Sequence, residues 1–157
     1  MTYADLLLWL HVIGATVLLG TGAGIAFFML VAHRTDDARL IAHVAGTVVT
    51  ADLLFTATAV VLQPLTGALL AREIGWPLSS PWIVLSLGLY VFTGLFWLPV
   101  VVIQVKMRDL ARKAVQENSF LPPGYYKLFR IWLACGFPAF IAVLAILWLM
   151  LMKPQFG

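Results

Sequence analysis

The sequence predicts an all-α, polytopic membrane protein: four transmembrane helices in one bundle, with both termini outside. Apolar residues make up 62% of the 157 residues and charged residues only 11%, whereas about a quarter of a soluble domain is charged. The apolar residues form four runs, and each is long enough for a bilayer core of about 30 Å, which needs about 20 helical residues. We therefore expect residues 1–157 to form a single transmembrane domain.

The first two spans are expected over residues 4–31 and 39–71. The charged loop between them offers Asp36 or Asp37 as the N-cap of the second helix, because a carboxylate accepts hydrogen bonds from first-turn amides. At 1.5 Å per residue the second run is about 48 Å long, more than the bilayer needs. We expect Pro64 to kink or end this helix, so that the residues after it tilt into the interface.

The last two spans are expected over residues 81–113 and 125–152. Pro81 occupies a favoured first helical position, and the helix should outgrow the membrane in the basic, amphipathic segment VKMRDLARKAVQ. The residues 122–124, Pro-Pro-Gly, predict a turn between the two helices.

Positive charge is distributed unevenly along the chain. Eight of the ten Lys and Arg residues lie at the first and third loops, against Arg72 and Lys153 at the other side. The positive-inside rule then places both termini outside, in the periplasm if the membrane is a bacterial inner membrane. The net charge is +3, but because most of the cations gather at these two loops, they indicate topology and do not point to a nucleic-acid partner.

Polar residues within the spans can be sorted by face, because helical residues 3, 4, 7 and 11 apart lie on one side. In the third span a single stripe contains Ser86, Tyr90, Thr93, Trp97, Gln104 and Arg108. In the second span Asp52, Thr56 and Gln63 share one face, while His43, Thr47 and Thr50 lie nearly opposite. His43 and Asp52 therefore cannot serve one site.

His11 lies inside the first apolar run, where an imidazole is costly unless it has a partner. We expect it about 10 Å inside the outer surface, and Asp52, about 22 Å from the inner end of its helix, at a similar level. Ser86 and Tyr90 reach that level too. The sequence thus predicts a buried polar cluster of these four residues, with Thr56, Thr93 and Trp97 beneath it.

Each candidate also has a structural interpretation: a His that hydrogen-bonds an Asp across helices can simply hold helices together, and aromatic residues fill bundle interiors. A second group, at the inner surface, contains Met29, His33 and Met107. Met29 and His33 are four residues apart, so their soft sulfur and imidazole ligands could hold copper.

Several fragments carry a resemblance along nearly the full length: HVIGATVLLGTGAG, AHR, ADLLFTATAVVLQPLTG, PWIVLSLGLYV, KMRDLA and FRIWLACGFPAF. Through them the chain resembles a bacterial family of predicted four-span integral membrane proteins known only as a domain of unknown function.

A more distant similarity is to the HemJ-type protoporphyrinogen oxidases and the copper-resistance protein D-like membrane proteins. It rests on LHVIG, TATAVVLQPLTG, KMRDLA and FRIW, in the same order and nearly the same spacing. The HemJ type associates haem b with a histidine of the first span, which His11 matches, and with a lysine of the third span, where this chain has Ser86. The resemblance implies haem b on His11 and leaves open whether the protein is an enzyme.

Three functions follow as expectations. The leading one is a redox protein that binds haem b, with Asp52 orienting His11, Trp97 beside the ring and Tyr90 as a weak ligand, and with a tetrapyrrole or quinone-linked redox partner. The second is a copper or proton conduit that uses Met29, His33 and Met107. The third is a non-catalytic membrane scaffold subunit, and a homo-oligomer is compatible with all three, as is contact with the lipid bilayer.

Overall fold

The computed structural model describes residues 1–154. In chain order the elements are α1 (Tyr3–Arg34), α2 (Ala38–Ala51), the π-helical segment η1 (Asp52–Thr56), α3 (Ala57–Glu73), α4 (Pro81–Gln116) and α5 (Pro123–Met152). Because α2, η1 and α3 follow one another without a break, the described residues form four helices that are long and apolar enough to cross a membrane. The predicted all-α, four-span fold is confirmed.

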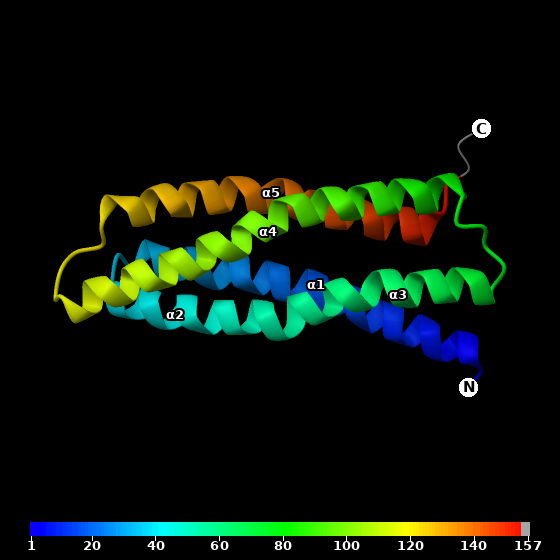
Figure 1. Ribbon diagram of the computed structural model, residues 1–157, viewed down its shortest axis with the longest axis horizontal. Helices are drawn as coiled ribbons and strands as arrows, with labels where there is room; N and C mark the ends of the chain where they lie inside the picture. Colours follow the sequence, from blue (N-terminus) through cyan, green and yellow to red (C-terminus); the bar gives the residue numbers. More distant parts are fainter. Residues whose placement is uncertain (155–157) are drawn as a thin grey trace.

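The four helices run up and down along one long axis (Figure 1). The first described residues, the connection 74–80 and the end of α5 lie together at one end, which we call the termini end. The connections 35–37 and 117–122 lie at the other end, which we call the basic end. It carries eight of the ten Lys and Arg residues: Arg34, Arg39, Lys106, Arg108, Arg112, Lys113, Lys127 and Arg130.

The connection between α1 and α2 uses its two aspartates differently. Asp37 caps α2, since its side chain accepts from the Arg39 amide at 2.8 Å. Asp36 adopts a left-handed backbone conformation, with φ of 54°, and accepts a hydrogen bond from the Tyr126 hydroxyl at 2.5 Å. The first connection is thereby tied to the start of α5.

Pro64 does not end the second transmembrane helix. It lies inside α3, which continues to Glu73. Proline has no amide hydrogen, so the carbonyl of Val60, four residues earlier, loses its helical donor. The hydroxyl of Tyr90 on α4 donates to that carbonyl instead. A donor from a neighbouring helix replaces the missing backbone bond, which is how proline is tolerated in transmembrane helices.

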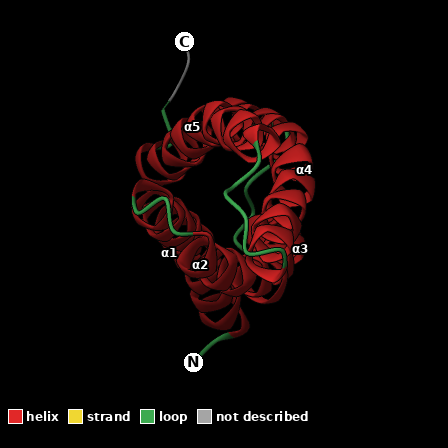
Figure 2. Cartoon of the chain, turned by 90° about the vertical axis from the view of Figure 1, so that its left-hand side faces the viewer, coloured by secondary structure: helices red, strands yellow, loops and turns green. Residues whose placement is uncertain are grey.

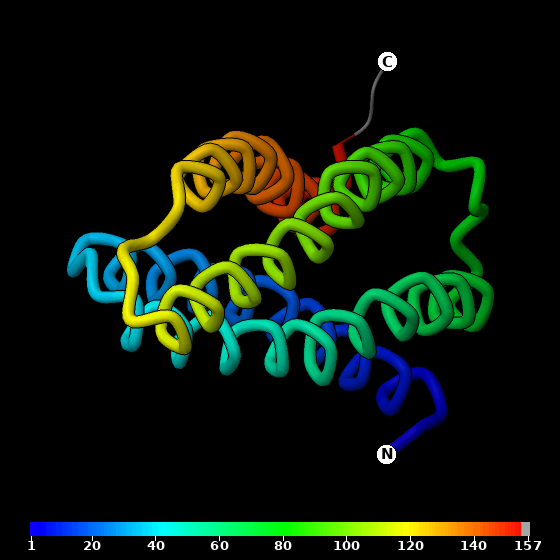
Figure 3. Tube along the Cα trace, turned by 60° about the vertical axis from the view of Figure 1, so that its left-hand side comes forward, coloured from blue at the N-terminus to red at the C-terminus, as the bar shows by residue number. Residues whose placement is uncertain are grey.

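The departure from α-helical geometry lies further upstream, at η1. The Ala57 amide donates to the Asp52 carbonyl, five residues back, as in a π-helix. Before this segment α2 packs on both α4 and α1, and after it α3 packs mainly on α1, which crosses the second span (Figures 1 and 3). The π-helical turn therefore lies where this span loses most of its packing on α4 and keeps its packing on α1.

Viewed along its length, the bundle has α4 and α5 on one side and α1, α2 and α3 on the other (Figure 2). The larger buried core lies toward the basic end and includes Met29, Ile41, Met107, Tyr125 and Trp132. A smaller core at the termini end joins Ala71, Trp82 and Ile83. Large apolar side chains are exposed along all four spans, as expected for helices whose outer faces contact lipid.

The Tyr90 bond predicts a specific coupling with Pro64. Tyr90→Phe leaves the Val60 carbonyl without a donor and should lower the free energy of unfolding by about 1 kcal/mol. In a Pro64→Ala background the backbone amide of the new alanine can donate to the same carbonyl, so Tyr90→Phe should cost much less. A double-mutant cycle from unfolding in mixed detergent micelles measures this difference, and an equal cost in both backgrounds would contradict it.

Candidate functional site

His11 is held in the interface between α1 and α3, and its partner is Thr66. Its Nδ1 lies 3.0 Å from the Thr66 Oγ1. The Thr66 hydroxyl donates to the Leu62 carbonyl at 2.7 Å, so Thr66 Oγ1 accepts a hydrogen bond from the N–H at His11 Nδ1. This arrangement fixes the imidazole tautomer and leaves Nε2 as its unprotonated nitrogen.

Gln63 and two glycines complete this contact. The Gln63 amide donates to the His11 carbonyl at 2.7 Å, and it occupies the space beside Gly14 that a side chain there would fill. A Cβ atom on Gly67 would lie 3.0 Å from His11 Cε1. Small residues thus let the two helices approach while polar side chains bond across them, a common way of joining transmembrane helices.

The predicted cluster around His11 does not assemble as expected. Asp52 precedes Thr66 by 14 residues, which is about 21 Å along the helix. Ser86 is buried, but its hydroxyl donates to the Trp82 carbonyl of its own helix at 2.7 Å. The prediction that Asp52 lies at the level of His11 assumed that the second span is only as long as the bilayer core is thick. In the structure, α3 continues to Glu73, about 32 Å beyond Asp52.

These positions bear on whether a haem fits His11. An axial His requires a hydrogen bond to its second nitrogen, and Thr66 supplies one. The other expected residues are engaged elsewhere: Tyr90 bonds the Val60 carbonyl, and Trp97 bonds Asp52. The imidazole itself lies against Gly67. The residues present therefore do not fit a haem held by His11 with Asp52, Tyr90 and Trp97 around it.

Asp52 is the buried ionisable residue near the middle of the bundle. The residue is 3% exposed, and its Oδ1 accepts from the Trp97 indole nitrogen at 3.3 Å. Its Oδ2 and the Thr56 hydroxyl, one turn later, are buried without a hydrogen-bond partner in the described part of the chain. Asp52 lies about 21 Å from the start of α2, well inside the apolar span.

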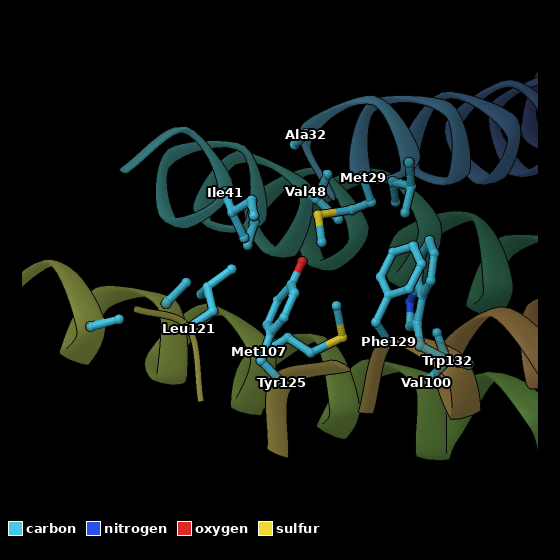
Figure 4. Packing of buried hydrophobic residues seen from close by; sticks show 14 residues of the cluster. Met29, Ala32, Ile41, Val48, Val100, Met107, Leu121, Tyr125, Phe129 and Trp132 are labelled. Carbon is cyan, nitrogen blue, oxygen red and sulfur yellow. The ribbon is translucent and has the colours of Figure 1, made fainter. Parts of the chain in front are cut away.

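Further unpartnered polar atoms lie between Asp52 and the basic end. Gln104 follows Trp97 by seven residues on the same face of α4, and its Oε1 is buried without a partner, as are the Tyr125 hydroxyl and His33 Nδ1. Figure 4 shows the Tyr125 hydroxyl directed from α5 toward Met29 and Val48. Native proteins rarely leave such groups unpaired, and ordered water is a common partner.

Of the three residues of the predicted copper site, Met29 and Met107 lie in one buried core, and His33 is not part of that core. Met29 and Met107, 1% and 0% exposed, belong to the same buried core, beside Tyr125 (Figure 4). His33 stacks on Phe129 with a centroid separation of 3.6 Å. Within residues 1–154 no group of three or more His, Cys, Asp or Glu side chains is arranged to hold a metal.

Two glycines of α1 offer a matched pair of substitutions. Gly14→Ala forces Gln63 away from the His11 carbonyl and should lower the free energy of unfolding by about 1–3 kcal/mol. Gly20 has no neighbour within 4 Å of an added Cβ, so Gly20→Ala should raise stability by up to about 1 kcal/mol through helix propensity. Unfolding in mixed micelles tests both, and equal effects of the two substitutions would disprove this account of the contact.

Comparison with known proteins places the chain in a family. Neither a curated protein nor a solved structure matches it, so the similarity to the HemJ-type and copper-resistance proteins stays a sequence-based expectation. The model of one family, described as "Predicted integral membrane protein (DUF2269)", matches residues 5–154. Because this match covers nearly the whole chain, the protein belongs to the DUF2269 family of predicted integral membrane proteins.

Proposed function

We propose that this membrane protein conducts protons, with Asp52 as the group that binds and releases them. The observation that carries the proposal is a carboxylate, 3% exposed, with one oxygen unpartnered, deep inside an apolar span. Ionisable side chains at such depth are costly, and in membrane proteins they commonly mark ion pathways and proton relays. This is the proton form of the conduit expected from the sequence.

The groups around Asp52 can hydrogen-bond both its ionised and its protonated form. The Trp97 indole donates to Oδ1 and supports the carboxylate, while Oδ2 is free to take a proton. Proton binding at Oδ2 produces a neutral carboxyl group, whose O–H can donate to the Thr56 hydroxyl one turn away. The same residue begins η1, and π-helical segments are frequent at functional sites.

The polar atoms toward the basic end supply a route. His33, one residue before the end of α1, and Tyr125, in the first turn of α5, lie near that end, and Gln104 lies on α4 seven residues after Trp97. From Gln104 to Trp97 the rise along α4 is about 10 Å, a gap that two or three hydrogen-bonded waters could bridge. We infer that protons reach Asp52 from the basic end.

The charge distribution supports an orientation. Eight cations at the basic end against Arg72 and Lys153 at the other favour a cytoplasmic basic end under the positive-inside rule. In a bacterial inner membrane the termini end would then face the periplasm, and Asp52 would receive protons from the cytoplasmic side.

Proton flux into vesicles tests the proposed function. The purified protein is reconstituted into liposomes that contain a pH-sensitive dye, and a potassium diffusion potential drives protons inward. Asp52→Asn preserves the shape and the Trp97 contact but cannot exchange a proton, and we expect it to reduce the flux at least tenfold. Asp109, an exposed aspartate paired with Arg108, provides the control Asp109→Asn, which should conduct like the original protein.

Infrared difference spectra provide a second readout that does not depend on transport. Acidification should reveal a carboxyl C=O band in the original protein that Asp52→Asn lacks. Equal flux and equal spectra for both proteins would refute the role of Asp52. A Soret band that His11→Ala abolishes would instead favour the haem function, and Cu(I) binding lost in Met29→Leu would favour the copper conduit.

The orientation has its own test. In a Cys135→Ala background, Ser79→Cys lies in the connection at the termini end and Ser119→Cys in the connection at the basic end. A membrane-impermeant maleimide applied to cells with a permeable outer membrane should label position 79 and should spare position 119 until the inner membrane is opened. The reverse pattern would invert the proposed topology.

A further inference from the structure

A groove of about 650 Å³ runs along the outer side of α2, on the face opposite Asp52. At one end it is lined by His43, Gly46 and Arg112, and at the other by Leu54 and Phe55. The Thr hydroxyls between the two ends donate to carbonyls of their own helix, so the groove has one cationic end and one apolar end.

Arg112 reaches the groove from α4. Its Nη2 lies 3.2 Å from the place where a Cβ atom on Gly46 would be, so the guanidinium packs closely against the α2 backbone at this glycine. The ion pairs within residues 1–154 are Arg108 with Asp109 and Lys113 with Glu117. The Arg112 guanidinium is therefore an exposed cation with no carboxylate partner among those residues.

Along the membrane normal, the groove extends over about the thickness of one leaflet. Leu54 lies eight residues beyond Gly46, about 12 Å further into the span. Leu54 and Phe55 are exposed in the apolar part of the helix, whereas Arg112 lies beyond Lys106, outside it. The cationic end thus falls at the level of lipid headgroups and the apolar end at the level of acyl chains.

We propose that this groove binds an anionic phospholipid of the leaflet at the basic end. The Arg112 guanidinium pairs with the lipid phosphate, a partner that its planar set of donors matches. An acyl chain of the same lipid lies along Leu54 and Phe55. The surrounding cations of the basic end favour an anionic lipid over a zwitterionic one. The inference is independent of proton handling by Asp52, which lies on the other face of the same span.

Lipid titration of the delipidated protein in neutral detergent tests the site. Native mass spectrometry counts bound phosphatidylglycerol and phosphatidylcholine, and we expect clear preference for phosphatidylglycerol. Arg112→Gln should weaken that binding about fivefold. Lys113→Gln removes the same charge from the adjacent, outward residue that pairs with Glu117, and it should leave binding within a factor of two.

A second variant separates shape from charge. Gly46→Leu keeps every cation but fills the place of the Arg112 guanidinium, and it should weaken binding as Arg112→Gln does, with far-ultraviolet circular dichroism unchanged. Equal losses in Arg112→Gln and Lys113→Gln would show attraction by net charge alone and would overturn the proposal. Displacement of the lipid by inorganic phosphate at millimolar concentration would also overturn it, because the site would then recognise free phosphate.

Discussion

In the hydrocarbon core of a membrane no water is present to bond a backbone group that loses its helical partner, and this constraint shapes the second span. Pro64 removes the donor of the Val60 carbonyl, and the Tyr90 hydroxyl replaces it from α4. One hydroxyl thereby satisfies the carbonyl that Pro64 leaves open, within a helix that continues to Glu73, and joins two spans that otherwise separate toward the termini end. The length and path of this helix in turn determine where Asp52 and Thr66 lie.

The polar residues of the bundle fall into two groups with different energetics. Between α1 and α3, the partners His11, Thr66 and Gln63 bond one another or nearby backbone, so this contact can join helices without any further role. Around Asp52 and Gln104 the polar atoms are buried and incompletely bonded. Leaving such groups unpaired costs about 1–3 kcal/mol each, which is why that region, rather than His11, points to water and to a function.

The sequence was sufficient for the fold, because four apolar runs and a one-sided charge distribution permit few arrangements. The Asp37 cap and the inward stripe of α4 also follow from local rules, since Trp97 and Tyr90 both reach the second span. The depth of Asp52 in the membrane, relative to His11, could not be predicted from such local rules. It depended on whether Pro64 ended its helix, and the donor that replaces the bond lost at Pro64 comes from Tyr90, 26 residues further along the chain. Thr66 was missed as the partner of His11 for the same reason, although it shares a face with Gln63.

A structural role for Asp52 does not account for its chemistry. An asparagine would accept the same bond from Trp97, and it would avoid the cost of holding a carboxylate away from water. Among residues 1–154, Asp52 is the buried carboxylate, and its second oxygen is buried without a hydrogen bond. No cation is paired with it in that part of the chain. A carboxyl group in this position can relieve its own desolvation by binding a proton, and under the proposed function the unpartnered atoms toward His33 would supply that proton from the basic end.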